Sequence, residues 1–179
     1  GDLIDRGRDS AAALRWLGLP WFHAVLGNHE DMALGAVDDA DTLFWWTRVN
    51  GGEWWLDQDE ELRGRLLDAF RRLPLIIEVE TREGLAGVVH ADVPRNLSWE
   101  RFVKRLAKGD QRCRETALWG RSRVRDADAA PVEGIDKVFC GHTPVPAPRV
   151  VGNVCFIDTG ACYGGDLALL PLEWPFPAG

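Results

Sequence analysis

The chain has 179 residues and a net charge of −7, with 46% hydrophobic and 27% charged residues. These values are typical of one soluble globular domain and exclude a disordered chain, so we expect residues 1–179 to form a single domain. Basic residues interleaved with aromatic ones, which a nucleic-acid surface needs, do not occur, and the apolar runs are too short to cross a bilayer. With no signal-peptide pattern at its start, the protein is expected in the cytoplasm, with neither nucleic acid nor a membrane as partner. The oligomeric state stays unknown.

The first half of the chain predicts helices separated by glycine-rich turns. Small and apolar residues predict a short helix that stops at Gly18 and Pro20, and Asn50-Gly51-Gly52 marks another strong break. The expected helices span residues 10–17, 41–49 and 59–72, and an expected strand spans residues 21–26.

The second half changes to β-strands, with a polar, partly helical stretch between them. We expect strands at residues 75–80, 85–90, 137–140, 154–158 and 166–170, and helices at residues 99–108 and 113–118. This order of elements is typical of an α/β layered sandwich, in which sheets are flanked by helices.

Three of the expected strands end in a polar cluster. The clusters are Gly27-Asn28-His29-Glu30, His90-Ala91-Asp92 and Gly141-His142, and they hold three of the four histidines in the chain. In open α/β sheets, ligands collect at the carboxyl ends of strands, so these clusters could converge on one site. The fourth histidine, His23, lies inside an expected strand and is interpreted as structural.

The side chains at these positions form a mixed set of oxygen and nitrogen donors. Asp2, Asn28, His90 and His142 would offer carboxylate, amide and imidazole ligands, which suit divalent manganese, iron or zinc. A single histidine at a strand end is more often structural, but three at matching positions favour a metal site.

Four motifs, in order along the chain, resemble those of one enzyme family. They are Gly1-Asp2-Leu3-Ile4-Asp5-Arg6-Gly7, Gly27-Asn28-His29-Glu30, His90-Ala91-Asp92 and Gly141-His142-Thr143-Pro144. They resemble the GDxxDRG, GNHE, HxD-like and GHT motifs of the serine/threonine phosphoprotein phosphatases, which are metallophosphoesterases. The segments Gly51-Gly52-Glu53-Trp54 and Leu73-Pro74-Leu75 are similar to the lambda-type branch. The resemblance implies the calcineurin-like metallophosphoesterase fold, a layered sandwich of two mixed β-sheets flanked by helices.

The resemblance also implies a role for each matching residue. Asp2 would bridge two divalent ions, with manganese favoured and iron, zinc or magnesium as alternatives. The metal ligands implied are Asp2, Asn28, His90 and His142. His29 would protonate the leaving oxygen with Asp5 orienting it, while Arg6 and Arg121 would bind the substrate phosphate. A hydroxide shared by the two ions would attack phosphorus directly, so none of the cysteines would act as a nucleophile.

Each of these interpretations has a plainer alternative. Arg6 and Arg121 could form surface salt bridges, Asp5 could cap a turn or helix, and Glu30 could be an ordinary helix-start carboxylate rather than a support of its loop. The pairs Trp45-Trp46 and Trp54-Trp55 could line a substrate groove, although packing is the commoner role for tryptophan.

The function implied is that of a metal-dependent serine/threonine protein phosphatase acting on a phosphoprotein or phosphopeptide. A symmetrical bis(5'-nucleosyl)-tetraphosphate hydrolase, which shares most of the motifs, is one alternative. A non-catalytic remnant of the fold is another. The family's DxHG motif, which precedes GDxxDRG, is absent from the residues given, so we expect the sequence to be N-terminally truncated and weak or inactive as a catalyst by itself.

Overall fold

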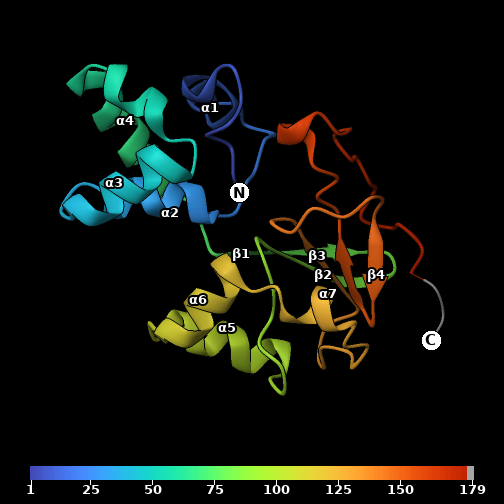
Figure 1. Ribbon diagram of the computed structural model, residues 1–179. Helices are drawn as coiled ribbons and strands as arrows, with labels where there is room; N and C mark the ends of the chain where they lie inside the picture. Colours follow the sequence, from blue (N-terminus) through green and yellow to red (C-terminus); the bar gives the residue numbers. More distant parts are fainter. Residues whose placement is uncertain (177–179) are drawn as a thin grey trace. The chain divides into compact units, whose positions relative to one another are not determined.

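The computed structural model describes residues 1–176 and divides the chain into two compact units (Figure 1). The first unit is Gly1–Pro74 and the second begins at Leu75. The single domain expected over residues 1–179 stays a prediction. No helix within residues 1–176 is long and apolar enough to cross a membrane.

The first unit is built from helices. The helices expected at residues 41–49 and 59–72 are confirmed to within one residue at each end. The helix expected at residues 10–17 is a 3-10 turn followed by a short α-helix, and a further helix, α2, lies directly after the glycine of the second motif. The elements are a 3-10 turn at Ser10–Ala12, α1 (Ala13–Leu17), α2 (Asn28–Gly35), α3 (Ala40–Val49), a 3-10 turn at Glu53–Asp57 and α4 (Glu60–Arg71). The carboxylates of Asp39 and Asp59 accept hydrogen bonds from the first-turn N–H groups of α3 and α4, which explains where both helices begin.

The core of this unit forms where the apolar faces of its helices meet. Leu66 and Phe70 of α4, Trp46 of α3 and Ala33 of α2 are all fully buried. The spacing of Leu66 and Phe70 places both on one face of α4, as the amphipathic sequence predicts.

The prediction of a strand at residues 21–26 is wrong. This segment is irregular, and its main-chain bonds in the structure are isolated ones, such as Leu26 N–H to the carbonyl oxygen of Pro74 at 2.7 Å. A β-strand requires a continuous ladder with a neighbour, and an apolar sequence alone does not supply one.

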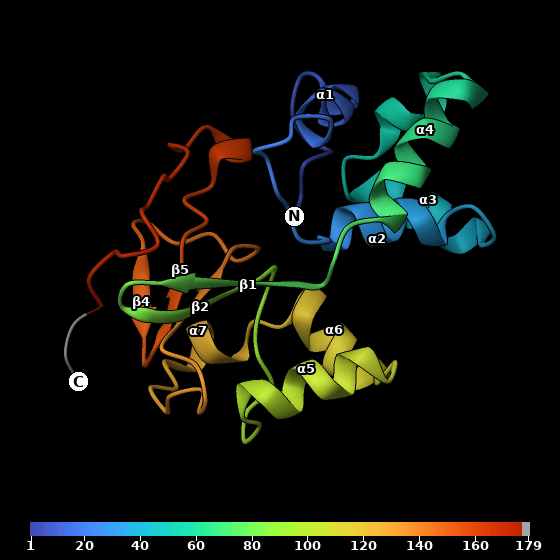
Figure 2. The same cartoon turned by 180° about the vertical axis from the view of Figure 1, so that it is seen from behind.

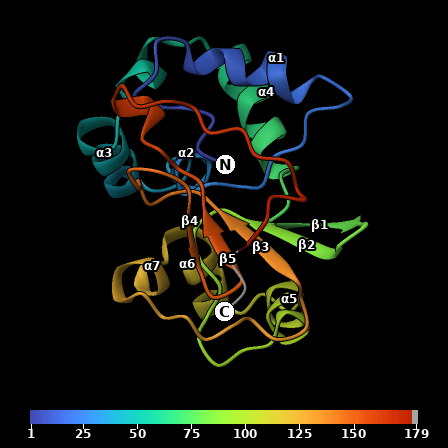
Figure 3. The same ribbon diagram turned by 90° about the vertical axis from the view of Figure 1, so that its right-hand side faces the viewer.

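The second unit contains a mixed five-stranded sheet in the order β1-β2-β3-β5-β4 (Figure 3). Its strands are β1 (Ile76–Thr81), β2 (Gly84–Val89), β3 (Lys137–Cys140), β4 (Arg149–Val151) and β5 (Val154–Phe156). Strands β2, β3 and β5 run parallel, and β1 and β4 pair antiparallel at the two edges. The α/β class with a mixed sheet and helices is confirmed, although the described residues form one sheet where two were expected. Residues 166–170 are irregular rather than a strand.

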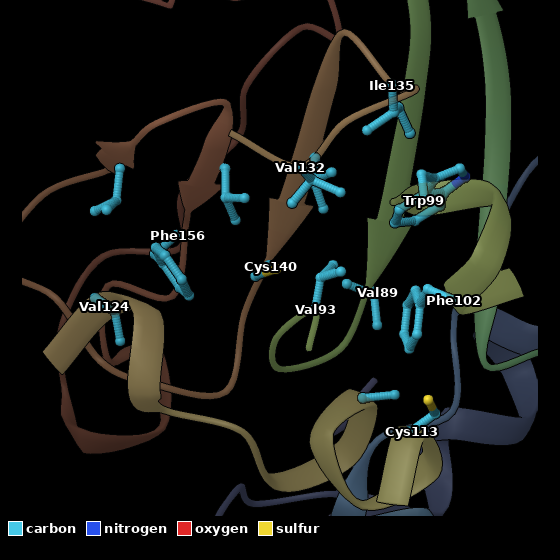
Figure 4. Close-up of a cluster of buried hydrophobic side chains, with 14 of the residues drawn as sticks. Val89, Val93, Trp99, Phe102, Cys113, Val124, Val132, Ile135, Cys140 and Phe156 are labelled. Carbon is cyan, nitrogen blue, oxygen red and sulfur yellow. The ribbon is translucent and has the colours of Figure 1, made fainter. Parts of the chain in front are cut away.

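Each face of this sheet is covered by a different part of the unit. On one face lie α5 (Trp99–Ala107), α6 (Gln111–Trp119) and α7 (Ser122–Asp126), as Figure 2 shows from behind. Trp99 and Phe102 of α5 and Cys113 of α6 pack there against Val89 and Cys140 of the sheet (Figure 4). On the other face, Leu170, Leu172 and Phe176 pack on a cluster that includes Phe139 and Cys155. Leu170 is therefore apolar because it covers the sheet, not because it belongs to it.

Candidate functional site

Glu30 fixes the loop that carries the first motif. Its carboxylate is fully buried and accepts three main-chain hydrogen bonds, from Gly27 N–H and Asp2 N–H at 2.9 Å each and from Leu3 N–H at 2.6 Å. Gly27 leaves room for this arrangement, because a Cβ atom there would lie 2.3 Å from the nitrogen of Asp2 and 2.4 Å from its Oδ1. Glu30 therefore supports the loop and also caps the start of α2 through Gly27 N–H, so both interpretations of this carboxylate hold. These bonds place the start of α2 directly against Asp2.

The main chain is strained at several candidate residues. Asp2, Asp5 and Arg6 have φ values of 57°, 74° and 55°, and His142 has a φ of 65°. Non-glycine residues adopt this left-handed region at a cost, and such residues concentrate at functional sites. Among residues 1–176, only Asn96 and Ala127 share this property outside the motifs.

His29 and Asp5 form a buried pair. Nδ1 of His29 lies 2.5 Å from Oδ2 of Asp5, and the two side chains are 4% and 0% exposed. The N–H of Asp5 is in turn bound by the hydroxyl of Ser10 at 2.9 Å. The Asp5 carboxylate therefore holds the imidazole by a hydrogen bond, and the N-cap of the following helical turn is Asp9 rather than Asp5.

Arg6 contacts the other side of the same imidazole. Its guanidinium donates to Nε2 of His29 over 2.9 Å. Because a guanidinium can only donate, Nε2 accepts in this structure and Nδ1 carries the proton shared with Asp5.

In the second unit, the parallel strands β2 and β3 bring two histidines together. His90 follows β2 and His142 lies two residues beyond β3, and Val89 is in register with Cys140. Gly141 N–H donates to the carbonyl oxygen of His90 at 2.8 Å. Nε2 of His90 and Nδ1 of His142 are consequently 3.1 Å apart, as expected for side chains at the carboxyl ends of neighbouring parallel strands.

Asp92 ties this strand end to the segment that carries Arg121. Its fully buried carboxylate accepts from Arg123 N–H at 3.1 Å and from Val93 N–H at 2.8 Å, and it lies 3.6 Å from Nε of Arg123. Burial raises the pKa of Asp92, and the hydrogen bonds from Arg123 and Val93 oppose that rise. Arg121 itself is exposed at the start of α7.

The donors in both units suit a divalent cation. Two nitrogen ligands about 2.1 Å from one ion lie about 3.0 Å apart in octahedral geometry and about 3.4 Å apart in tetrahedral geometry. The separation of 3.1 Å between the His90 and His142 nitrogens lies in this range. In the first unit, burial and then the charge of Glu30 raise the pKa of Asp2 to about 6. A bound cation would favour the ionised carboxylate there. Asn28, the first residue of α2, is buried beside His29.

Two residues of this site were missed in the sequence. The indole N–H groups of Trp46 and Trp54 each donate to the Asp5 carboxylate over 2.6 Å. Both tryptophans pack in the first unit, as the plainer alternative held, while Trp45 is 60% exposed. Trp46 lies 41 positions and Trp54 lies 49 positions after Asp5 in the chain, and no local sequence pattern predicts hydrogen bonds over such separations. The feature of the sequence that pointed to these residues is the two tryptophan pairs on either side of Gly51-Gly52.

The chain belongs to the calcineurin-like phosphoesterases, whose family model matches residues 1–146. Phosphoesterases are hydrolases, so this is an enzyme family. Its curated relatives include serine/threonine-protein phosphatase 2 of Salmonella typhimurium, which is 36% identical over 97% of this chain and 78% of its own length. The protein of the same name from Escherichia coli is 32% identical with the same coverage. An asymmetrical bis(5'-nucleosyl)-tetraphosphatase of Oceanobacillus iheyensis is more distant, at 25% identity over 62% of this chain and 44% of its own.

Proposed function

We propose that the protein is a metal-dependent serine/threonine protein phosphatase that hydrolyses phosphomonoesters of a phosphoprotein or phosphopeptide. The observation that carries this proposal is the buried pair of His29 and Asp5, with the second imidazole nitrogen directed at a phosphate-binding type of side chain, Arg6. The curated relatives that match nearly the whole chain and bear this name support it.

Asp2, Asn28, His90 and His142 are the proposed ligands of two divalent ions, with manganese favoured. Bound there, the ions would activate water and offset the charge of the phosphate. Glu30 holds the main chain of Asp2 through hydrogen bonds, so that the position of this ligand does not depend on the ion alone.

Arg6 and Arg121 are proposed to bind the phosphate oxygens. A guanidinium fits two oxygens of a phosphate in its plane, which an ammonium does not. Arg6 is exposed and reaches His29 Nε2 in this structure, so an arriving phosphate dianion would compete with the imidazole for the same guanidinium.

His29 is proposed to donate a proton to the departing serine or threonine oxygen. In the donating state both ring nitrogens carry protons. The Nδ1–H group stays hydrogen-bonded to the Asp5 carboxylate. The proton on Nε2 moves to the leaving oxygen as the bond between that oxygen and phosphorus breaks. The Asp5 carboxylate stabilises the charged ring, because it lies 2.5 Å away and is shielded from water.

The experiment that tests this function is hydrolysis by the full-length gene product of a phosphoserine peptide and of diadenosine tetraphosphate, each with and without manganese. Turnover of the peptide that stops on chelation and returns with manganese supports the proposal. Faster hydrolysis of the dinucleotide would favour a nucleotide hydrolase; the tetraphosphatase relative is named as asymmetrical, whereas the alternative expected from the motifs is the symmetrical enzyme. Asp2→Asn is the matched control, because it keeps the size of the side chain and removes the charge that two cations need.

A further inference from the structure

We infer that Trp46 and Trp54 are positioning residues for the proton donor, acting through the Asp5 carboxylate on His29. This inference rests on the proposed function, because it assigns a role within the same site.

The two indoles complete the hydrogen bonding of Asp5. Trp54 donates to Oδ1 and Trp46 donates to Oδ2, both over 2.6 Å, and Oδ2 also receives Nδ1 of His29. The Asp5 side chain is 0% exposed, so water does not replace a donor that is lost. An under-bonded buried carboxylate is costly, and it is free to rotate toward its remaining donors.

The chain builds this arrangement from a short turn. Trp46 lies in α3 and Trp54 in the following 3-10 turn, with Asn50-Gly51-Gly52 between them. Gly51 has a φ of 85°, and a Cβ atom on Gly52 would lie 2.5 Å from the indole of Trp46. The main chain at Gly52 therefore packs directly against the Trp46 ring. The indoles of Trp46 and Trp54 meet edge to face with their centroids 6.4 Å apart. Because no space is left between the turn and the Trp46 ring, we expect this side chain to be held in one orientation.

The consequence for the imidazole follows from the direction of these bonds. An indole N–H is a donor only, and two such donors on different oxygens fix the plane of the carboxylate. The plane of the carboxylate then sets the direction of Nδ1–H of His29, and hence where Nε2 points. Loss of either indole N–H is expected to misplace the transferred proton while leaving phosphate binding by the arginines intact.

The test compares Trp54→Phe and Trp46→Phe on two substrates that differ in their need for a proton. Departure of a serine alkoxide needs protonation, whereas p-nitrophenolate leaves without it. We expect kcat on a phosphoserine peptide to fall at least about 10-fold, a part of the 10²–10⁴-fold that general acid catalysis supplies. The KM for the peptide and kcat on p-nitrophenyl phosphate should change by less than about 2-fold, because neither depends on the acid.

Trp55→Phe is the matched control. Trp55 is buried and packs against both indoles, with centroids 5.3 and 5.7 Å away, but it serves this cluster by packing and not by a bond to Asp5. Equal losses on both substrates in the Trp54→Phe protein, or a Trp55→Phe protein with the same selective loss, would overturn the inference. If the wild-type protein is active on both substrates and neither variant loses activity selectively on the peptide, the inference is contradicted and the proposed function is not. A wild-type protein inactive on both substrates overturns the proposed function and the inference with it.

Two further measurements separate positioning from lost packing. In an Asp5→Asn protein, adding Trp54→Phe should not lower kcat on the peptide any further, because both substitutions break the same chain of contacts. A double variant whose loss in kcat is the product of the two single losses would contradict the inference. If Trp46→Phe does not fold, 3-benzothienylalanine at position 46 replaces the N–H by sulfur in a ring of the same shape. The same selective loss is expected from it, and normal peptide turnover would overturn the inference.

Discussion

The carboxylate of Glu30 lies 2.9 Å from the main-chain nitrogen of Asp2, 28 residues earlier in the chain. This bond joins the first motif to the second without the side chain of either proposed metal ligand. The GNHE motif therefore places four different groups one after another at the start of α2. Gly27 leaves room for the loop, Asn28 is a proposed metal ligand, His29 is the proposed proton donor, and Glu30 holds the loop.

Replacing Glu30 tests that link. In Glu30→Gln, one acceptor oxygen becomes an amide that faces main-chain N–H groups, so the free energy of unfolding should fall by about 2–3 kcal/mol. Manganese affinity should fall about 10- to 100-fold, because a support of the ligand loop is lost. Urea unfolding and calorimetric titration measure the two quantities. Glu61→Gln, at an exposed position of α4, is the control, and equal stability of the two variants would contradict the account.

Gly27 and Gly64 make a matched pair of alanine substitutions. At Gly27 a Cβ atom would collide with Asp2, so Gly27→Ala should lower the free energy of unfolding by about 3 kcal/mol. At Gly64, within α4, nothing lies within 4 Å, so Gly64→Ala should raise it by about 0.5–1 kcal/mol. Thermal unfolding decides the matter, and a Gly27→Ala protein that melts like wild type would show that the loop is not packed as described.

The buried pair of Asp92 and Arg123 predicts a larger effect than a surface pair does. Asp92→Ala leaves the buried guanidinium of Arg123 without its carboxylate, which should cost about 3–5 kcal/mol of unfolding free energy. Asp126→Ala breaks a half-exposed pair with Arg95 and should leave the unfolding midpoint nearly unchanged. Chemical denaturation of both variants measures this difference, and similar midpoints would contradict it.

Thiol reactivity separates this chemistry from that of a cysteine nucleophile. Burial raises the pKa of Cys155 to about 11 and raises the pKa of Cys140 well above its usual range, so both thiols stay protonated at pH 8. A thiol is a far weaker nucleophile than a thiolate. In the native protein, a disulfide reagent at pH 8 should label the exposed Cys162 rapidly and the three buried cysteines only after unfolding. Activity should survive this labelling, with Cys162→Ser as the control; rapid labelling of a second cysteine with loss of activity would contradict the account.

Local patterns were sufficient to predict most elements of this fold. The apolar face of α4 and the apolar runs of β2 and β3 each predict one element, and the structure contains them within one or two residues. Residues 21–26 look like a strand for the same reason, but strand formation depends on a neighbour that the local sequence does not reveal. Helix α2 was missed because the residues that begin it are polar and serve the site.

Only those residues of the site that belong to a sequence motif could be predicted from the sequence. His29 and Asp5 lie 24 residues apart, and only the resemblance to a family pairs them; the structure places them in contact. The indoles of Trp46 and Trp54 belong to no motif, and their contact with Asp5 depends on a turn whose geometry requires two glycines. Contacts of that kind follow from packing, which sequence patterns do not contain.

The most direct test of the central claim is the leaving-group dependence of His29→Asn. The account predicts that wild-type kcat changes little between a phosphoserine peptide and p-nitrophenyl phosphate, and that the variant loses about 10²- to 10⁴-fold on the peptide but much less on p-nitrophenyl phosphate. An equal loss on both substrates, in a variant that still folds and binds manganese, would contradict the assignment of His29 as the proton donor.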